Sequence, residues 1–325
     1  MAVLTTICTQ TLNDFMFFTI LQKIKIMKTP NYLSEGCRIA IVSPAGYINP
    51  DFVASAESYL KSIGYEVEIS KHCLGRHNQM AGTDEERLAD LQQALDNPKI
   101  DAILCSRGGY GVNHIIGKLN MSNFRKHPKW ILGFSDITNL HILASQNGVK
   151  SLHCQMAKAI HNNPNAECIS DIFKILHGEK VSYTAEPNEL NRKGTAKGTL
   201  IGGNMSIIYS LQGTDFAIDC DDKILFIEDL NEYLYHLDRM LINLKMSGKL
   251  AKLRGLVIGT FSDMKDNASP FGKTAYEIVK AHTAEYSYPV GFGFPIGHID
   301  DNRPLVEGGT YKLEITDKIC SLKMV

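Results

Sequence analysis

The stretch Arg38-Ile-Ala-Ile-Val-Ser-Pro-Ala-Gly46 is a short apolar run that ends in turn residues. An apolar run of this length is typical of a strand that is buried on both faces in a parallel sheet. Apolar residues at helical spacing follow over 52–63, Gly64 ends that pattern, and a second strand is expected at Tyr65–Ile69. The stretch therefore opens a strand–helix–strand unit.

The alternation of strands and helices continues beyond this unit. The segment Thr83-Asp-Glu-Glu86 has the spacing of a capping box and predicts a helix that begins near residue 84. The later elements predicted here are a strand at Ala102–Cys105, a helix near Val112–Leu119, a strand at Trp130–Leu132 and a helix near Asp136–Gln146. Such alternation is typical of an α/β fold with a doubly wound parallel sheet, which we expect over residues 38–157.

The rest of the chain divides into three parts. Residues 158–197 are more polar and rich in turn residues, which is typical of a linker between domains. Residues 198–325 alternate strands and helices again and predict a second, smaller α/β domain. Residues 1–37 lack the basic start of a secretory signal, and we expect them to be an N-terminal extension, disordered in part, with the natural start at Met27.

Composition excludes several classes of protein. The 34 Lys and Arg residues nearly balance the 35 Asp and Glu residues, and no basic run is present, so we expect no nucleic-acid or membrane-surface partner. No apolar run reaches the roughly 18 residues that span a bilayer. The eight cysteines include no C-x-x-C pair. This pattern argues against a zinc site and indicates a reducing compartment, so we expect a cytoplasmic protein that needs no metal.

The segment Gly133-Phe-Ser-Asp136 joins an apolar strand to a helix. A tight turn in this position lifts a serine hydroxyl clear of the backbone, and the first helical N–H groups point at negative charge that develops beside it. Ser135 is therefore a candidate nucleophile. From this segment alone, a serine that merely caps the helix is the more common case.

A glycine-rich turn, Ser106-Arg-Gly-Gly-Tyr-Gly111, follows the preceding strand. It lacks the sequence of a phosphate-binding loop, but its glycines allow close approach and expose N–H groups. We interpret it as the source of a second oxyanion donor, provided that neighbouring parallel strands place it beside Ser135. An ordinary strand-to-helix turn fits this pattern equally well.

A catalytic serine needs a base, and the base needs a group that orients it. Among eleven histidines, His298 stands out because it lies in a glycine-containing loop after an apolar strand, where functional residues of α/β sheets concentrate. His153 is the main alternative, whereas His114 and His141 are expected on helix surfaces. Glu228 ends another apolar strand and is a candidate for the orienting carboxylate, although such residues are usually solvated.

Six segments, taken together, resemble the LD-carboxypeptidase family, which comprises murein tetrapeptide carboxypeptidases and their microcin-immunity relatives. The segments are Ala81–Leu91, Cys105–Gly111, Gly133–Thr138, Gly202–Asn204, Phe226–Asp229 and Gly297-His298. The resemblance covers roughly residues 38–316. It implies a flavodoxin-like N-terminal domain, a smaller C-terminal α/β domain and an active site between them.

The resemblance also implies roles for individual residues. Ser135 matches the nucleophile in the family's G-[YF]-S-D-I-T elbow. Glu228 matches the acidic member of a Ser–His–Glu triad, and His298 matches the base. The N–H groups of Gly109 and Asp136 resemble the family's oxyanion donors.

The activity implied by the resemblance is that of a serine carboxypeptidase that needs no cofactor. It would remove the C-terminal D-alanine from murein tetrapeptides in the cytoplasm during cell-wall recycling, as a homodimer. Arg107, by its position, is a candidate partner for the free carboxylate of the substrate, and Tyr110 is a second candidate substrate contact. The segment His153-Cys154-Gln155 departs from the His-Gly-Pro of many relatives, so one wall of the cleft is expected to differ.

Three alternatives stay open. The chain could cleave peptidyl or aminoacyl adenylates, as in the microcin-immunity relatives, but the only tryptophan, Trp130, lies in a predicted strand rather than in an adenine-stacking wall. A cleft that binds a peptide or a flavin without hydrolysis is disfavoured because all three triad positions hold competent residues. Cys105 ends a strand, but no elbow glycine precedes it, so a packed cysteine is favoured over a nucleophile.

Overall fold

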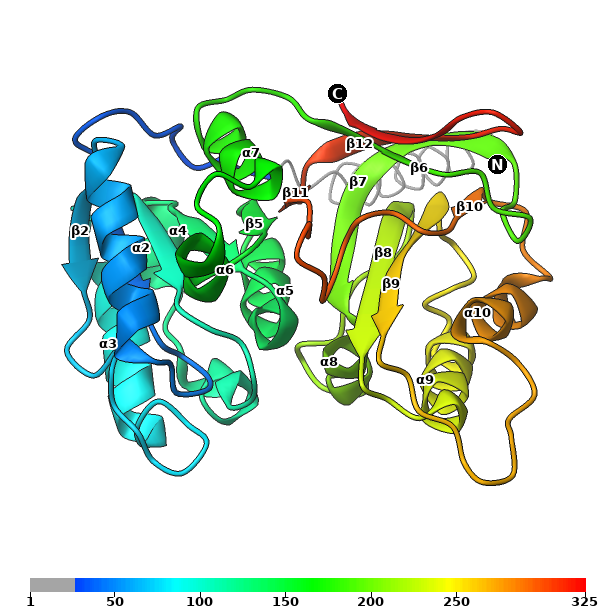
Figure 1. The fold of residues 1–325 in the computed structure, drawn as a ribbon, viewed down its shortest axis with the longest axis horizontal. Helices are drawn as coiled ribbons and strands as arrows, with labels where there is room; N and C mark the ends of the chain where they lie inside the picture. The colour runs from blue at the N-terminus through cyan, green and yellow to red at the C-terminus, as the bar shows by residue number, and fades with distance from the viewer. Residues whose placement is uncertain (1–26) are drawn as a thin grey trace, which may run out of the picture.

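The computed structural model describes residues 27–325, and the expectations for residues 1–26 lie outside this part of the chain. Figure 1 shows two sheets that lie side by side, each with its own helices. The first sheet is built mainly from the N-terminal half and the second from the C-terminal half. The expectation of an α/β fold with two domains is confirmed.

The first sheet has the strand order β11-β5-β4-β3-β1-β2. Its strands are β1 (Arg38–Val42), β2 (Glu66–Ile69), β3 (Ala102–Cys105), β4 (Trp130–Gly133), β5 (Ser151–His153) and β11 (Leu305–Glu307). The first five pair in parallel, as the alternation of strands and helices predicts. Their order, 2-1-3-4-5, is the flavodoxin-like order that the family resemblance implies. β11 arrives from the C-terminal half and pairs antiparallel with β5.

Both faces of the first sheet are covered, as the apolar run of β1 predicts. Ile39 and Ile41 face one apolar cluster and Ala40 and Val42 face another, because successive side chains of a strand point to opposite sides. The first cluster includes residues of α2 (Pro50–Ser62), α6 (Ala157–Asn162) and α7 (Glu167–Leu176). The second includes residues of α3 (Asp84–Asp96), α4 (Ser122–Lys126) and α5 (Thr138–Gln146).

The helices predicted from short sequence segments agree with the structure in some places and differ from it in others. The capping box at the start of α3 is confirmed, because Thr83 Oγ1 accepts the Glu86 N–H and the Glu86 carboxylate accepts the Thr83 N–H. The helix expected near Val112–Leu119 is wrong: the chain forms two short 3₁₀ turns, η1 (Val112–His114) and η2 (Ile116–Lys118). Gly117 interrupts this segment, and glycine is a poor helix former.

The second sheet has the order β10-β9-β8-β7-β12-β13-β6. Its strands are β6 (Ser182–Ala185), β7 (Gly194–Asn204), β8 (Lys223–Leu230), β9 (Gly255–Ser262), β10 (Val290–Gly291), β12 (Thr310–Ile315) and β13 (Cys320–Met324). β7 to β10 are parallel, and β12, β13 and β6 continue the sheet in antiparallel pairing. Helices α8 (Met205–Ser210), α9 (Leu234–Met246) and α10 (Ala275–Thr283) contribute to one apolar cluster with this sheet. In Figure 1, α8 and α9 lie below the strands and α10 lies to their right.

Two segments that were expected from the sequence to be a linker and an N-terminal extension hold parts of this fold. The region 158–197 holds most of α6, all of α7 and β6, and the start of β7. Its helices pack on the first sheet, and its strands belong to the second. Before β1, Leu33 is buried and the Asn31 carbonyl accepts the Trp130 Nε1–H at 2.9 Å. Residues 27–37 therefore lie against the first sheet. Within residues 27–325, no helix combines the length and the apolar character that a bilayer crossing requires.

Candidate active site

Ser135 lies in a strained turn between β4 and α5. It is the first residue of the 3₁₀ turn η3 (Ser135–Ile137), and its φ of +65° is a left-handed conformation that residues other than glycine rarely adopt. Gly133 precedes it with a φ of +151°, and a Cβ there would approach Ile137 Cγ1 to 2.9 Å. The turn thus requires glycine at 133 and projects the Ser135 side chain from the end of the sheet.

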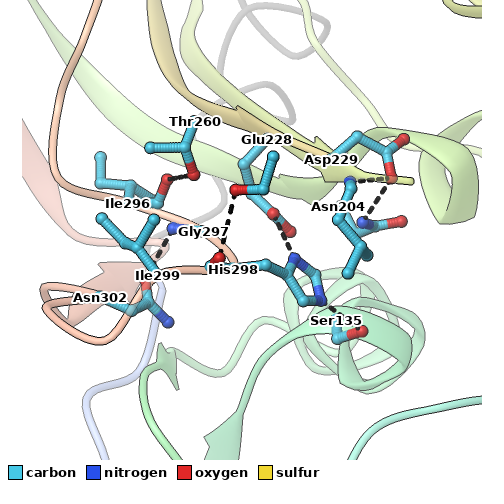
Figure 2. Close-up of polar contacts among 12 residues, drawn as sticks. Ser135, Asn204, Glu228, Asp229, Thr260, Ile296, Gly297, His298, Ile299 and Asn302 are labelled. Atoms are coloured by element: carbon cyan, nitrogen blue, oxygen red, sulfur yellow. Dashed lines mark hydrogen bonds and ion pairs between the residues drawn. The ribbon is translucent and has the colours of Figure 1, made fainter. Parts of the chain in front are cut away.

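Figure 2 shows that His298 lies between Ser135 and Glu228. Its Nε2 is 3.0 Å from Ser135 Oγ, and its Nδ1 is 2.7 Å from Glu228 Oε2. Because a carboxylate only accepts hydrogen bonds, Nδ1–H is the donor to Glu228, which leaves Nε2 of the neutral ring free to accept from the serine hydroxyl. The structure therefore brings together three side chains that the sequence places far apart.

Two carboxylates control the charge of His298. Burial by itself lowers the pKa of this imidazole, but the charge and hydrogen bond of Glu228 and the charge of Asp229 outweigh it, so the pKa is raised above its ordinary value. Glu228 is fully buried at the end of β8, where its charge is poorly screened. The arrangement favours an imidazole that readily takes up a proton.

The loop that carries His298 is tied to neighbouring strands. Gly297 has a φ of +119°, and a Cβ there would come within 2.8 Å of Glu228 Oε2, so only glycine lets the loop approach the carboxylate this closely. Asn302 Oδ1 accepts the Gly297 N–H at 2.8 Å (Figure 2). Ser262 Oγ donates to the His298 carbonyl at 3.1 Å. Sequence reasoning missed Asn302 and Ser262, because a single polar residue in a loop or at a strand end carries no recognisable spacing.

The glycine-rich loop after β3 packs directly on Ser135. β3 and β4 are parallel neighbours, so their carboxyl ends meet at one edge of the sheet. A Cβ on Gly108 would be 2.9 Å from Ser135 Cβ, and Gly109 follows with a φ of +102°. Gly108 therefore lies against the serine, and Gly109 lines the same cleft as Ser135. Asp136 is the residue after the serine in η3. As the sequence indicated, this loop has to lie beside Ser135 if it is to supply a second oxyanion donor. The structure meets this requirement.

A cleft of about 1010 Å³ opens at this edge of the first sheet. Its walls include the glycine-rich loop, the turn at Ser135, the α6–α7 region and the segment 298–301. Arg107 lines the cleft and donates through Nη1 to the Tyr47 carbonyl at 2.7 Å. Tyr110 is not among the lining residues: its ring is half exposed and meets His114 edge-on at 5.4 Å. The structure thus brings Arg107, but not Tyr110, to the candidate site.

Two other histidines are poorly suited to act as a base. His153 is fully buried, and burial lowers its pKa to about 3. The expectation that His141 lies on a helix surface is wrong, because α5 is packed between the first sheet and the second, and burial lowers the pKa of His141 to about 4. His141 Nε2 donates to the Gly133 carbonyl at 2.8 Å, so it supports the turn before Ser135.

Cys105 and Asp229 are also buried near the site. Burial raises the pKa of the Cys105 thiol, which disfavours the thiolate and excludes this residue as the nucleophile. Asp229 follows Glu228, accepts Asn204 Nδ2–H at 3.0 Å and the Ser206 N–H at 2.8 Å, and has its pKa raised to about 7 by burial and by the charge of Glu228. Among residues 27–325, no group of three or more His, Cys, Asp and Glu side chains is placed to hold a metal ion.

Two stretches of the chain match known protein domains. Residues 39–154 match the LD-carboxypeptidase N-terminal domain, and residues 197–313 match the LD-carboxypeptidase C-terminal domain. The class defined by these domains is a peptidase, a hydrolase that acts on peptides. The chain belongs to the LD-carboxypeptidase family.

Individual relatives agree with this assignment. The probable murein peptide carboxypeptidase of Bacillus subtilis is 32% identical over 89% of this chain and 92% of its own length. The crystal structure of muramoyltetrapeptide carboxypeptidase from Oxalobacter formigenes has a TM-score of 0.81 and 29% identity, and the match covers 88% of this chain and 98% of that one. The microcin C7 self-immunity protein, in complex with aspartyl sulfamoyl adenosine, shares the fold with a TM-score of 0.79 at 20% identity, over 92% and 98% of the two chains.

Proposed function

We propose that this protein is a serine LD-carboxypeptidase that releases the C-terminal D-alanine of murein tetrapeptides, with Ser135, His298 and Glu228 as its catalytic triad. The observation that carries the proposal is the continuous relay of hydrogen bonds, 3.0 Å from Ser135 Oγ to His298 Nε2 and 2.7 Å from His298 Nδ1 to Glu228 Oε2. The names of the related murein peptide carboxypeptidases support the substrate class.

The first half of the reaction is acyl transfer to the serine. His298 Nε2 takes the proton from Ser135 Oγ as this oxygen attacks the carbonyl before the terminal D-alanine. Glu228 holds the ring with its proton on Nδ1 and stabilises the imidazolium that forms. His298 then gives the proton to the nitrogen of the departing D-alanine, and the remaining peptide stays on Ser135 as an ester.

The glycine-rich loop supplies the electrostatic part of catalysis in this proposal. The N–H groups of Gly109 and Asp136 donate to the oxyanion of the tetrahedral intermediate, and one such donor contributes about 3 kcal/mol to its stabilisation in other serine hydrolases. Water, deprotonated by His298, then attacks the ester and regenerates the free serine. Arg107 provides a cation in the cleft for the carboxylate of the terminal D-alanine.

Product analysis tests the proposal. The purified protein is incubated with a murein tetrapeptide that ends in D-alanine, and with the same peptide ending in L-alanine, and the products are measured by mass spectrometry. We expect tripeptide and free D-alanine from the first peptide and little cleavage of the second. Covalent labelling by a fluorophosphonate, lost in Ser135→Ala, checks the nucleophile. Absence of tripeptide from a protein that does label at Ser135 would reject the substrate but not the serine chemistry.

The adenylate substrate serves as a further arm of this assay. Trp130 is buried in β4, where its Nε1–H donates to the Asn31 carbonyl, so it provides no stacking wall for an adenine. We therefore expect tetrapeptide cleavage to exceed hydrolysis of an aminoacyl adenylate. The proposal also places the protein in the cytoplasm as a homodimer. Light scattering during gel filtration measures its oligomeric state.

A further inference from the structure

Arg87 is a fully buried cation whose role the triad chemistry does not explain. It belongs to the segment Ala81–Leu91, one of the six that resemble the family, and its side chain is 0% exposed. Removing a guanidinium from water is costly unless hydrogen bonds replace the lost hydration. Its Nη1 donates to the Pro44 carbonyl at 2.7 Å and to the Gly111 carbonyl at 2.8 Å, and its Nη2 pairs with Asp84.

A second buried charge holds the same peptide unit from the other side. Asp136, the residue after Ser135, is fully buried, and its Oδ2 accepts the Val112 N–H at 3.0 Å. The peptide bond between Gly111 and Val112 is therefore held at its carbonyl by Arg87 and at its N–H by Asp136. Both contacts are hydrogen bonds to charged groups, which are about twice as strong as neutral ones.

The sequence at this point is adapted to the buried guanidinium. Gly111 has a φ of +132°, and a Cβ there would lie 2.7 Å from Arg87 Nη1. The other carbonyl bound by Arg87, that of Pro44, lies in the turn after β1, where the Gly46 N–H donates to the Gly108 carbonyl at 3.0 Å. Arg87 thus holds the glycine-rich loop directly at Gly111 and, through the β1 turn, at Gly108.

We propose that Arg87 is a positioning residue for catalysis, which together with Asp136 clamps the Gly111–Val112 peptide and so holds the Gly109 N–H at the oxyanion position beside Ser135. The proposal rests on the proposed function, because it assumes that the oxyanion forms at Ser135. Arg87 itself does not line the cleft. It acts through the backbone of the loop.

Lys129 offers a matched control in the same part of the molecule. It is also a buried cation, and its Nζ donates to the backbone carbonyls of Ala94 at 2.9 Å and Asn97 at 2.6 Å, at the C-terminal end of the helix α3 that carries Arg87. It does not line the cleft. Lys129→Met and Arg87→Met therefore each remove a buried cation that donates to two backbone carbonyls. Only Arg87→Met removes a hydrogen bond to the glycine-rich loop.

The first measurement compares D-alanine release by the full-length wild type and both variants. For Arg87→Met we expect kcat to fall on the order of 10- to 100-fold with KM changed by less than about threefold, because a displaced oxyanion donor weakens the transition state more than the bound substrate. Lys129→Met keeps the kcat of the wild type, although both variants unfold at a lower urea concentration. Equal kcat values for the two variants in an active protein would overturn the proposal.

The second measurement does not depend on the substrate. Hydrogen–deuterium exchange of peptides covering residues 106–115 is expected to be faster in Arg87→Met than in the wild type and in Lys129→Met. If Arg87→Met does not fold, Arg87→Lys is measured instead. This variant keeps the charge but replaces the several N–H donors of the guanidinium with one ammonium group, and we expect it to show the same changes to a smaller extent. A wild type that releases no D-alanine contradicts the proposed function, whereas equal exchange of this loop in all variants contradicts the clamp.

Discussion

At the scale of single residues, the left-handed backbone conformation of Ser135 lowers the stability of the fold, while the proposed activity requires the hydroxyl of this residue. A left-handed conformation costs a residue with a Cβ about 1 kcal/mol or more, and glycine escapes this cost. We predict that Ser135→Gly and Ser135→Ala both lose activity on the order of 10⁴-fold or more, since neither has a hydroxyl. Ser135→Gly should nevertheless have a free energy of unfolding about 1 kcal/mol higher than Ser135→Ala, measured by urea denaturation. Equal stabilities would show that the turn is unstrained.

In the proposed mechanism, the neutral imidazole of His298 is the base, and the charge on Glu228 sets the pH range in which it acts. Activity is then expected to fall as the pH falls through the pKa of His298, and this pKa is raised by Glu228 and Asp229. We predict that Glu228→Gln moves the acidic limb of the kcat/KM profile to lower pH and lowers kcat on the order of 10⁴-fold. Asp229 makes no hydrogen bond to the imidazole ring and acts on it only through its charge. Asp229→Asn should therefore move the acidic limb in the same direction but by less than Glu228→Gln does. An unmoved limb in Glu228→Gln would contradict this electrostatic account.

At the scale of elements, the turn after β3 must stay close to the turn after β4. A methyl group at Gly108 would meet Ser135 Cβ at 2.9 Å and Oγ at 3.2 Å. We predict that Gly108→Ala lowers kcat on the order of 100-fold, because it separates the glycine-rich loop from the serine. Gly117→Ala is the control: a Cβ there makes only ordinary contact with Phe216, 3.8 Å away, and activity should be unchanged. Assays of both variants alongside their melting temperatures separate a local displacement from general loss of fold.

Helices and strands were predictable where a few neighbouring residues form a recognisable pattern. The apolar run of β1 and the capping box of α3 depend on residues within one strand or one helical turn, and both form as expected. α7 escaped prediction because the Asn-rich segment before it was interpreted as part of a linker, and β7 because glycines dilute its pattern. His141 shows the same limit, since a neighbouring sheet, and not its own helix, determines its burial.

At the scale of the whole molecule, β11 and α5 join the two sheets. Figure 1 shows both elements in the middle, and β11 pairs with β5 of the first sheet while contacting β7 of the second. Glu307 of β11 is completely buried, its Oε2 accepts the Gly202 N–H at 3.2 Å, and burial raises its pKa to about 8. Burial therefore favours the protonated form of this carboxyl in the folded protein, whereas the carboxyl ionises in the unfolded chain at neutral pH.

The raised pKa of Glu307 makes stability depend on pH. A carboxyl whose pKa is raised in the folded state contributes fully to folding stability below its pKa in the unfolded chain, near 4.5. This contribution to stability is lost as the pH rises toward about 8. We predict that Glu307→Gln, which cannot ionise, loses less thermal stability between pH 5 and pH 8 than the wild type, measured by melting temperature across this range. The exposed Glu189→Gln should behave as the wild type does. An identical pH dependence in all three proteins would refute the assignment.

The sequence by itself determined many of the local elements and the candidates for the reactive groups. Strand-length apolar runs, the capping box and the glycine turns act over a few neighbouring residues, so their geometry can be read from short segments. Six such segments sufficed to indicate the family, which the domain matches confirm. They also identified Ser135, His298 and Glu228 as candidates before any distance between them was known.

Only the tertiary structure decided how these groups meet. Ser135 projects from the first sheet, whereas Glu228 and the loop with His298 belong to the second, and their 3.0 and 2.7 Å contacts depend on how the two sheets pack. The clamp by Arg87 and Asp136 likewise joins residues from different helices and turns. Long-range packing and the low dielectric of the interior set these distances and protonation states, and neither quantity is encoded in a local spacing.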